Sequence, residues 1–313
     1  MKIVTFTKKG RNLAETIISA CSDIGAELAD RDSKLSDICR KAFKNREAVV
    51  FIGAMGIAVR SITPYVADKL SDPPVIVIDE AGKHVIPVLS GHIGGANELA
   101  VRIADSINAE PVLTTATDVS GAFSVDLFAK ENDLRIVNRE GIAKVSSSAL
   151  EGKAVTLCIK DYPPQNDVDV LVTDESALKD SASIVLCPRK YAVGIGCRKG
   201  KPFDEIRNFA ESVLTENGII ADEIGAIATV DVKKNEPGLL RLSQYWRVPL
   251  LAFDSAVLNK VQGEFASSER VLSAVGTDNV CERASAAAAG KGYKLIVRKT
   301  AYNGITIAVS ERK

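Results

Sequence analysis

The chain has 313 residues, 46% of them hydrophobic and 26% charged, which is the balance of a folded globular protein and not of a disordered or fibrous one. Its 40 basic and 40 acidic residues cancel, so the whole chain has no field that would attract a nucleic acid, and an anionic ligand would need a locally basic pocket. The length fits two or three compact units, each with its own core.

The cysteine pattern and the absence of long apolar runs predict the compartment. The six cysteines show no CxxC pair and no histidine at metal-ligand spacing, which is typical of a reduced cytosolic chain and predicts no metal site. The first residues form a strand-like run without the apolar core of a signal peptide, and no apolar run approaches the ~20 residues of a membrane-spanning helix. We therefore expect a cytoplasmic protein without membrane contact.

Along residues 1–120, short β-branched runs alternate with segments of helical period, which predicts a Rossmann-like α/β domain with a mainly parallel sheet. The expected strands are residues 3–6, 48–52, 75–78, 85–89 and 112–114. The clearest helix begins near Gly95, because apolar residues recur with a 3.6-residue period from there to Ile107.

The periodicity weakens from about Gly121, where helices at 122–131 and 142–150 and strands at 155–159 and 168–172 are expected. We interpret residues 121–187 as a smaller middle α/β segment that spaces or covers and carries little chemistry. Residues 188–313 form a C-terminal α/β domain with strands expected at 191–195, 226–230 and 248–253 and helices at Pro202, Pro237 and 281–289. A final hairpin around Asn303 and Gly304 makes its sheet mixed.

The first motif is the turn Gly53-Ala-Met-Gly56 between a strand and a helix. Glycines at such a junction let the backbone approach a ligand, and the helix N–H groups then face an anion. The two glycines equally suit a tight turn without a ligand. The motif is neither a complete dinucleotide fingerprint nor a phosphate-binding loop, so a nucleotide site is disfavoured.

The best site candidate is the stretch from Leu89 to Glu98, where a strand ends and a long helix begins. Its polar and flexible residues are Ser90, Gly91, His92, Gly94, Gly95 and Asn97. In a parallel sheet this strand end is where ligands collect. His92 suits proton transfer near neutral pH, although it could instead cap the helix or bond a backbone carbonyl. A serine-hydrolase triad at Ser90 is disfavoured, because the nucleophile elbow is absent.

Further polar candidates follow other strands or lie on the helix. Glu98 is a catalytic candidate, but in the first helical turn, with Arg102 four residues on, an ordinary surface pair is the stronger interpretation. The cluster Thr114-Thr115-Ala-Thr117-Asp118 could bind carboxylates or orient a water, and it is also common turn and N-cap chemistry. In the C-terminal domain Thr229, Lys233 and Glu236 follow a strand, where Lys233 could pair with a ligand carboxylate or remain solvated.

Several of these stretches resemble the cobalt-precorrin-5A hydrolase family. The N-terminal similarity runs through FIGAMGIAVRSI, SGHIGGANEL and PVLTTATDV, and the C-terminal similarity through GIGC, ATVDVK and EPGL. Residues 125–187 resemble the family only loosely. Thr277 and Arg283 depart from the family pattern, which bears on local packing more than on activity.

The resemblance implies a step of anaerobic cobalamin biosynthesis, in which the ring A acetate δ-lactone of cobalt-precorrin-5A is opened and acetaldehyde is released to give cobalt-precorrin-5B. The cobalt macrocycle is itself the electron sink, so no cofactor is expected beyond the cobalt that the substrate carries. The expected catalytic residues are His92, Glu98 and Asp118, with N–H groups of Gly94, Gly95 and Ala96 as oxyanion donors. The expected substrate-binding residues are Gly53, Gly56, Arg60, Ser90, Gly94, Gly95, Asn97, Thr115, Thr117, Thr229, Lys233 and Glu236.

The expected partner is the cobalt corrinoid, with transient contact to the pathway's methyltransferases. Its carboxylates would meet the basic residues Arg60, Lys69, Arg198, Lys199 and Lys233 in a cleft between the two α/β domains. One alternative is a non-catalytic corrinoid-binding or hand-over protein, because no indisputable catalytic pair is visible. Another is a methyltransferase that binds S-adenosylmethionine at the Gly53 turn, which the resemblance disfavours.

Overall fold

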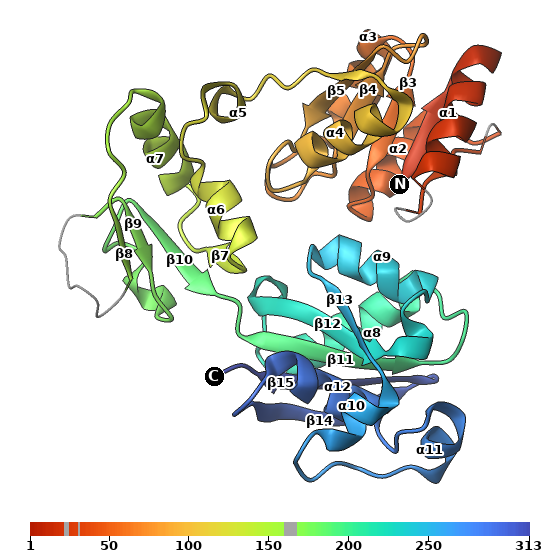
Figure 1. Ribbon diagram of the computed structural model, residues 1–313, viewed down its shortest axis with the longest axis vertical. Coiled ribbons are helices and arrows are strands. Elements are labelled where there is room, and N and C mark those ends of the chain that lie inside the picture. The colour runs from red at the N-terminus through yellow and green to blue at the C-terminus, as the bar shows by residue number, and fades with distance from the viewer. Residues whose placement is uncertain (22–24, 31, 160–167) are drawn as a thin grey trace. The chain divides into compact units, whose positions relative to one another are not determined.

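The computed structural model describes residues 1–21, 25–30, 32–159 and 168–313, and their contacts divide the chain into two compact units (Figure 1). Unit 1 holds Met1–Asn132, Ile136–Val172 and Ser176–Val185, and unit 2 holds Asp133–Arg135, Thr173–Glu175 and Leu186–Lys313. Three sheets lie along the chain, with helices between their strands, which confirms the predicted α/β class. In the part of the chain that is described, no helix is both long and apolar enough to cross a membrane. The exact domain boundaries at 120 and 187 stay a prediction.

The first sheet has the order β2-β1-β3-β4-β5-β6. Its strands are β1 Lys2–Thr5, β2 Glu27–Leu28, β3 Val49–Ile52, β4 Val75–Ile78, β5 His84–Leu89 and β6 Glu110–Pro111. Strands β1 to β4 run parallel to one another, and β6 runs parallel to β5. The expected strand at 112–114 is therefore displaced to β6, and the others agree with the sequence within a residue or two.

Helices cover both faces of this sheet because successive strand residues point to opposite sides. Val50 and Ile52 pack with the helices α1 Lys8–Ala20 and α4 Ala96–Ile107. Val49 and Phe51 face the other layer, formed by α2 Leu35–Lys44 and α3 Met55–Ile62, which continues into a short 3₁₀ turn at Thr63–Tyr65. All four strand residues are fully buried, so β3 is the centre of two cores.

Strand β5 runs antiparallel to β4, with Leu89 opposite Val75. The cause is the short connection at Asp79–Lys83, whose turn is held by N–H groups of Ala81, Lys83 and His84 on the Asp79 carboxylate. A parallel connection needs a dozen residues or more. The end of β5 therefore lies beside the start of β4, at the edge opposite the Gly53 turn that follows β3. The expectation that the stretch from Leu89 to Glu98 follows a parallel strand, at the carboxyl edge of the sheet, is wrong.

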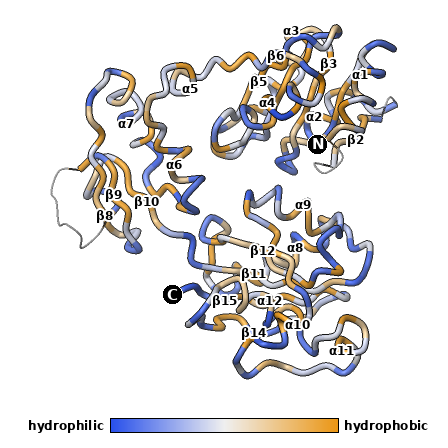
Figure 2. The backbone as a smooth tube through the Cα atoms, in the orientation of Figure 1, coloured by the Kyte–Doolittle hydropathy of each residue, from blue (hydrophilic) through white to orange (hydrophobic). Residues whose placement is uncertain are grey.

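The second sheet has the order β7-β10-β9-β8. It is built from β7 Leu134–Ile136, β8 Leu157–Ile159, β9 Val170–Val172 and β10 Ile184–Pro188, with helices α5 Ala116–Ser120, α6 Val125–Glu131 and α7 Gly141–Leu150 and a 3₁₀ turn at Ser176–Leu178. Figure 2 shows hydrophobic residues along β8, β9 and β10. Asn138 holds the turn before α7 to β10, because its amide donates to the Ser183 carbonyl at 3.0 Å and accepts from the Val185 N–H at 2.6 Å.

The third sheet lies in unit 2 and has the order β13-β12-β11-β15-β14. Strands β11 Tyr191–Cys197, β12 Ile224–Val230 and β13 Leu250–Phe253 are parallel, and the predicted terminal hairpin, β14 Lys294–Tyr302 and β15 Ile305–Glu311, adds two antiparallel strands. The helices are α8 Phe203–Glu216, α9 Pro237–Trp246, α10 Ser255–Lys260, α11 Glu269–Val275 and α12 Val280–Ala289, with 3₁₀ turns at Ala221–Glu223 and Asp231–Lys233. Pro237 begins its helix as predicted, whereas Pro202 is the N-cap and not the first residue of α8.

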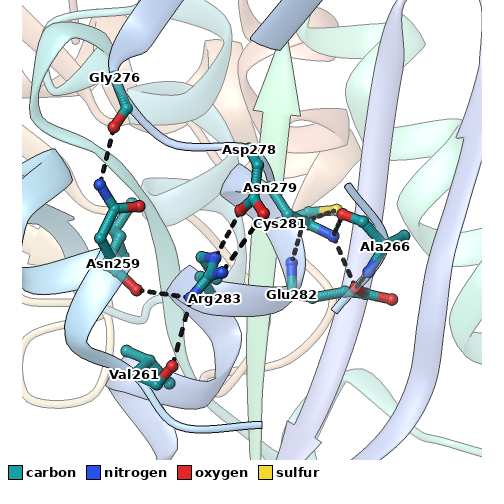
Figure 3. A network of polar contacts seen from close by, with 10 residues as sticks. Asn259, Val261, Ala266, Gly276, Asp278, Asn279, Cys281, Glu282 and Arg283 are labelled. Carbon is teal, nitrogen blue, oxygen red and sulfur yellow. Dashed lines mark hydrogen bonds and ion pairs between the residues drawn. The ribbon is translucent and has the colours of Figure 1, made fainter. Parts of the chain in front are cut away.

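A buried polar network fixes the start of α12 (Figure 3). Asn279 caps the helix by accepting from the Glu282 N–H at 3.0 Å, and the Glu282 carboxylate accepts from the Asn279 amide at 2.6 Å. The Asn279 side chain therefore both caps α12 and donates to the Glu282 carboxylate, so the two side chains hold each other at the helix start. Arg283 pairs with Asp278 at 2.7 Å. Thr277 is fully buried, and its hydroxyl has no hydrogen-bond partner among the described residues. Thr277 and Arg283 therefore contact the protein interior at this helix start, and their expected lack of effect on activity stays a prediction.

Candidate active site

The loop between β5 and α4 is tightly folded around Ser90 and Gly94. Ser90 has a positive φ of 60°, and its hydroxyl donates to the Asp72 carbonyl at 2.8 Å. A Cβ on Gly94 would collide with the Ser90 side chain and lie 2.5 Å from the Ser90 carbonyl oxygen, so only glycine fits there. Gly95 is the N-cap of α4 with a φ of 83°, where glycine is favoured. Ser90 is buried and holds the loop, which makes it a structural residue.

The N–H groups of this loop are mostly used within the loop itself. Gly95 donates to the His92 carbonyl and Ala96 to the Ser90 carbonyl, both at 3.0 Å. Two of the three expected oxyanion donors are therefore occupied. The Gly94 N–H has no hydrogen-bond partner among the described residues, and it is the one of the three that can bind an oxyanion without breaking the loop.

The imidazole of His92 lies between two helices that follow this loop in the chain. Its Nε2 is 3.3 Å from the hydroxyl of Thr117 on α5. Its Nδ1 is 3.4 Å from both the Ser124 hydroxyl and the Asp126 carboxylate at the start of α6. The side chains of His92 and Asp126 are only 11% and 10% exposed, so this is a nearly buried histidine–carboxylate pair.

The carboxylate of Asp126 is ionised in this setting. Burial by itself would raise its pKa, but hydrogen bonds from His92 and Ser124 and the charges of His92 and Lys69 outweigh burial and lower the pKa to about 2. The effect of Lys69 places this exposed lysine within electrostatic range of the pair. Lys69 is one of the basic residues proposed to meet the substrate's carboxylates, and the structure places its charge near Asp126.

Three other expected site residues, Asn97, Glu98 and Asp118, lie on the helices next to this loop. The Asn97 amide donates to the Thr115 hydroxyl at 3.1 Å, which joins α4 to the start of α5. Glu98 is 78% exposed and pairs with Lys130 of α6 at 2.8 Å, so it forms a surface ion pair with a partner other than the expected Arg102. Asp118 belongs to α5, but its side chain lies outside the described residues.

The Gly53 turn follows β3 and lies at the opposite end of the strands from the His92 loop, because β5 runs antiparallel to β4. Gly53 has a φ of 153°, and a Cβ there would lie 2.9 Å from the Phe6 ring. The Arg60 guanidinium donates to the Gly56 carbonyl of its own helix at 3.1 Å. The structure therefore brings Gly53, Gly56 and Arg60 together, but not with His92. Their role in substrate binding stays a prediction.

The candidates of unit 2 surround the ends of β11 and β12. Thr229 is fully buried and donates to the Ile195 carbonyl at 2.7 Å, so it is an internal sheet residue and cannot contact a substrate. Lys233 pairs with the buried Glu236 at 2.9 Å, and Glu236 also accepts from the Gly200 N–H at 2.6 Å. Burial would raise the pKa of Glu236, but these hydrogen bonds and the nearby lysine charges lower it. Glu236 thus holds the 198–201 loop through Gly200 as well as pairing with Lys233 of its own loop.

Ser124 and Asp126 were not expected from the sequence. They lie in the segment interpreted as carrying little chemistry, and that interpretation does not fit their contact with His92. The only local signal is Ser-Val-Asp at a helix start, which reads as ordinary capping. The described residues contain no group of three or more histidine, cysteine, aspartate or glutamate side chains placed to hold a metal ion.

A paired, nearly buried histidine beside an unoccupied backbone N–H is typical of an α/β enzyme that moves protons. Residues 37–118 match the family described as Cobalamin synthesis G N-terminal, and residues 191–310 match Cobalamin synthesis G C-terminus. The chain belongs to the cobalt-precorrin-5A hydrolase family. It is 34% identical to the cobalt-precorrin-5A hydrolase of Salmonella typhimurium over 273 residues, which cover 80% of this chain and 78% of that protein.

Two further relatives extend the comparison. The probable cobalt-precorrin-5A hydrolase of Methanocaldococcus jannaschii is 32% identical over 326 residues, which cover 99% of this chain and 98% of that protein. Protein CobE of a Sinorhizobium species is 30% identical over 119 residues, which cover 38% of this chain and 77% of that protein. His92 and Thr117 lie inside the N-terminal family match, whereas Ser124 and Asp126 lie between the two matches.

Proposed function

We propose that this hydrolase opens the ring A acetate δ-lactone of cobalt-precorrin-5A and releases acetaldehyde to give cobalt-precorrin-5B. The observation that carries the proposal is the His92 ring, held on Nδ1 by Asp126 and directed through Nε2 towards Thr117. Family membership supports the choice of substrate. Both chemical steps need a proton acceptor at one place, and His92 is a suitable group near neutral pH.

In the first step His92 Nε2 removes a proton from a water molecule that attacks the lactone carbonyl carbon. The Gly94 N–H stabilises the resulting oxyanion. The ring C–O bond then breaks, and the proton held by His92 passes to the leaving oxygen. The products are an acetate carboxylate on ring A and a free hydroxyl on the carbon that bears the methyl group.

In the second step the free hydroxyl loses its proton to His92. Its C–O bond becomes the carbonyl of acetaldehyde while the C–C bond to the macrocycle breaks. The electron pair of that bond enters the conjugated cobalt macrocycle, which later takes up a proton. The reaction is therefore balanced with water as the sole co-reactant, and the proposal includes no cofactor beyond the cobalt of the substrate.

Two further parts of the proposal concern the surroundings of the enzyme. The described cysteines are all free thiols, which suits the reducing cytoplasm, and we propose that location. Transient contact with the pathway's methyltransferases, which would pass the corrinoid on, stays a prediction.

The test is acetaldehyde release from cobalt-precorrin-5A by purified His92→Gln and His84→Gln variants. We expect His92→Gln to lose on the order of 10²-fold or more in kcat, the usual contribution of general acid–base catalysis. His84 is the other histidine, exposed and paired with Asp79 at 3.3 Å, and its variant should keep wild-type turnover. A wild-type protein that binds the corrinoid without releasing acetaldehyde would instead be a hand-over protein.

A further inference from the structure

The side chains at the start of α6 contact His92 and do not cap their own helix. Ser124 is the N-cap residue, yet its side chain makes no capping hydrogen bond. Its hydroxyl donates instead to the Asp126 carboxylate at 2.5 Å. A serine at this position usually accepts from the N–H groups of the first turn and so stabilises the helix. The local structure gives up this contribution to hold a carboxylate against the imidazole.

A simple link between α4 and α6 does not explain the pair. The Glu98–Lys130 ion pair already joins these two helices at the surface, with side chains 78% and 38% exposed. The His92–Asp126 pair joins the same region with both side chains nearly buried. Burying ionisable groups costs free energy even when they are paired. A buried second link is therefore better explained by control of the imidazole.

We propose that Asp126, held by Ser124, is a positioning residue that keeps the proton of neutral His92 on Nδ1 and leaves Nε2 as the proton acceptor. A carboxylate can only accept a hydrogen bond from Nδ1. The single hydroxyl proton of Ser124 is directed to Asp126, so Ser124 also presents a lone pair to Nδ1. Asp126 and Ser124 therefore both act as acceptors towards Nδ1, and the hydrogen bond at one ring nitrogen sets the tautomer of the ring.

The consequence for the molecule is that the middle segment completes the site. His92 and Thr117 follow strands of the first sheet, whereas Ser124 and Asp126 begin the first helix of the next segment. The catalytic consequence rests on the proposed function. The tautomer does not, because it is a property of the free protein.

The tautomer can be read by NMR in the full chain labelled with ¹⁵N-histidine, at a pH where the ring is neutral. The His84→Gln background leaves His92 as the one remaining histidine. We expect the Nδ1–H tautomer in this background. Asp126→Asn offers an amide donor to Nδ1 and should move the ring to the Nε2–H tautomer. Lys130→Met breaks the surface link without touching the imidazole and should leave the spectrum unchanged.

An Nε2–H tautomer in the His84→Gln background would overturn the proposal, and so would an unchanged tautomer in a folded Asp126→Asn variant. If Asp126→Asn fails to fold, Asp126→Ala takes its place. This change removes the carboxylate acceptor from Nδ1 and frees the Ser124 hydroxyl to donate or accept, so it should give a mixed population of tautomers. A population identical to the background would contradict the proposal.

Turnover separates this proposal from the proposed function. Asp126→Asn should lower kcat by at least about 10-fold, up to the loss seen in His92→Gln, with KM nearly unchanged. The double variant His92→Gln/Asp126→Asn should lose no more kcat than His92→Gln alone, because Asp126 acts only through His92. If the tautomer is as expected but His92→Gln keeps full turnover, the base assignment fails and the positioning result stands. If His92→Gln is inactive but the tautomer is Nε2–H, the base assignment stands and the positioning proposal fails.

Discussion

The Oδ1 atom of Asp126 lies 3.4 Å from Nδ1 of His92 and joins the helix α6 to the loop that follows β5. The carboxylate remains ionised although its side chain is only 10% exposed. Because a buried ionised carboxylate needs partners, Asp126 depends on His92 and Ser124 for its charge state, and the contact in turn orients the imidazole. This dependence has consequences for stability as well as for catalysis.

The first prediction concerns the pH dependence of folding stability. The pKa of Asp126 is lowered from 3.8 to about 2, so its contribution is fully present above the unfolded value and is lost as the pH falls towards the folded one. Asp126→Asn cannot titrate. The free-energy difference between wild type and this variant should therefore shrink by about 1 kcal/mol between pH 6 and pH 3. Urea unfolding at both pH values measures it, and a constant difference would contradict the lowered pKa.

The second prediction tests the steric requirement at Gly94. Gly94→Ala places a Cβ against the backbone and side chain of Ser90, which cannot move away because Ser90 is bonded to Asp72. We expect a loss of roughly 1–3 kcal/mol in unfolding free energy, the usual cost of overpacking. Gly56→Ala is the control, since its Cβ would meet only the flexible end of Arg60 at 3.1 Å, and it should not destabilise. Equal melting temperatures for wild type and Gly94→Ala would refute the collision.

The fold was largely predictable because strands and helices leave local signals. The buried run at Val49–Ile52 and the 3.6-residue period of Ala96–Ile107 identify their elements directly. The direction of β5 was not predicted from these signals, although the short turn after Asp79 required it. Reading connection length as well as periodicity would have placed the Gly53 turn and His92 at opposite edges.

The site was predictable only in part because a hydrogen-bond partner can come from a distant stretch of the chain. His92 and Thr117 stand out as polar residues after strands. Asp126 carries no such signal, since an acidic residue in the first turn of a helix is ordinary. Thr229 shows the opposite error, because a threonine at a strand end looks like a binding residue and is instead fully buried.

The third prediction concerns substrate binding near His92. Lys69 is exposed, and its charge acts on Asp126, so it can pair with a carboxylate of the bound corrinoid. Lys69→Met should raise KM about tenfold or more with little change in kcat, because a charge-assisted hydrogen bond contributes roughly 1.5–3 kcal/mol. Lys44→Met, on α2, is the control and should leave KM unchanged. An unaltered KM for Lys69→Met would remove this residue from the binding site.

The last prediction separates stability from binding in unit 2. Lys233 was expected to contact substrate, but its ammonium already pairs with the buried Glu236 at 2.9 Å. Lys233→Met leaves this carboxylate with the Gly200 N–H but without its cation, and the unfolding free energy should fall by roughly 1–3 kcal/mol at neutral pH. The neighbouring Lys234 is exposed and is not the lysine that pairs with Glu236, so Lys234→Met should have the unfolding free energy of the wild type.

The sign of the pH effect identifies the cause. The folded pKa of Glu236 is lowered, so the ion pair stabilises the fold above the unfolded pKa, and this contribution is lost as the pH falls through the folded value. Wild type and Lys233→Met should therefore approach each other in stability under acid conditions. Corrinoid titration of the folded variant then tests binding separately. A normal melting temperature with weakened binding would show that Lys233 serves the ligand, and that its pairing with Glu236 contributes little to the fold.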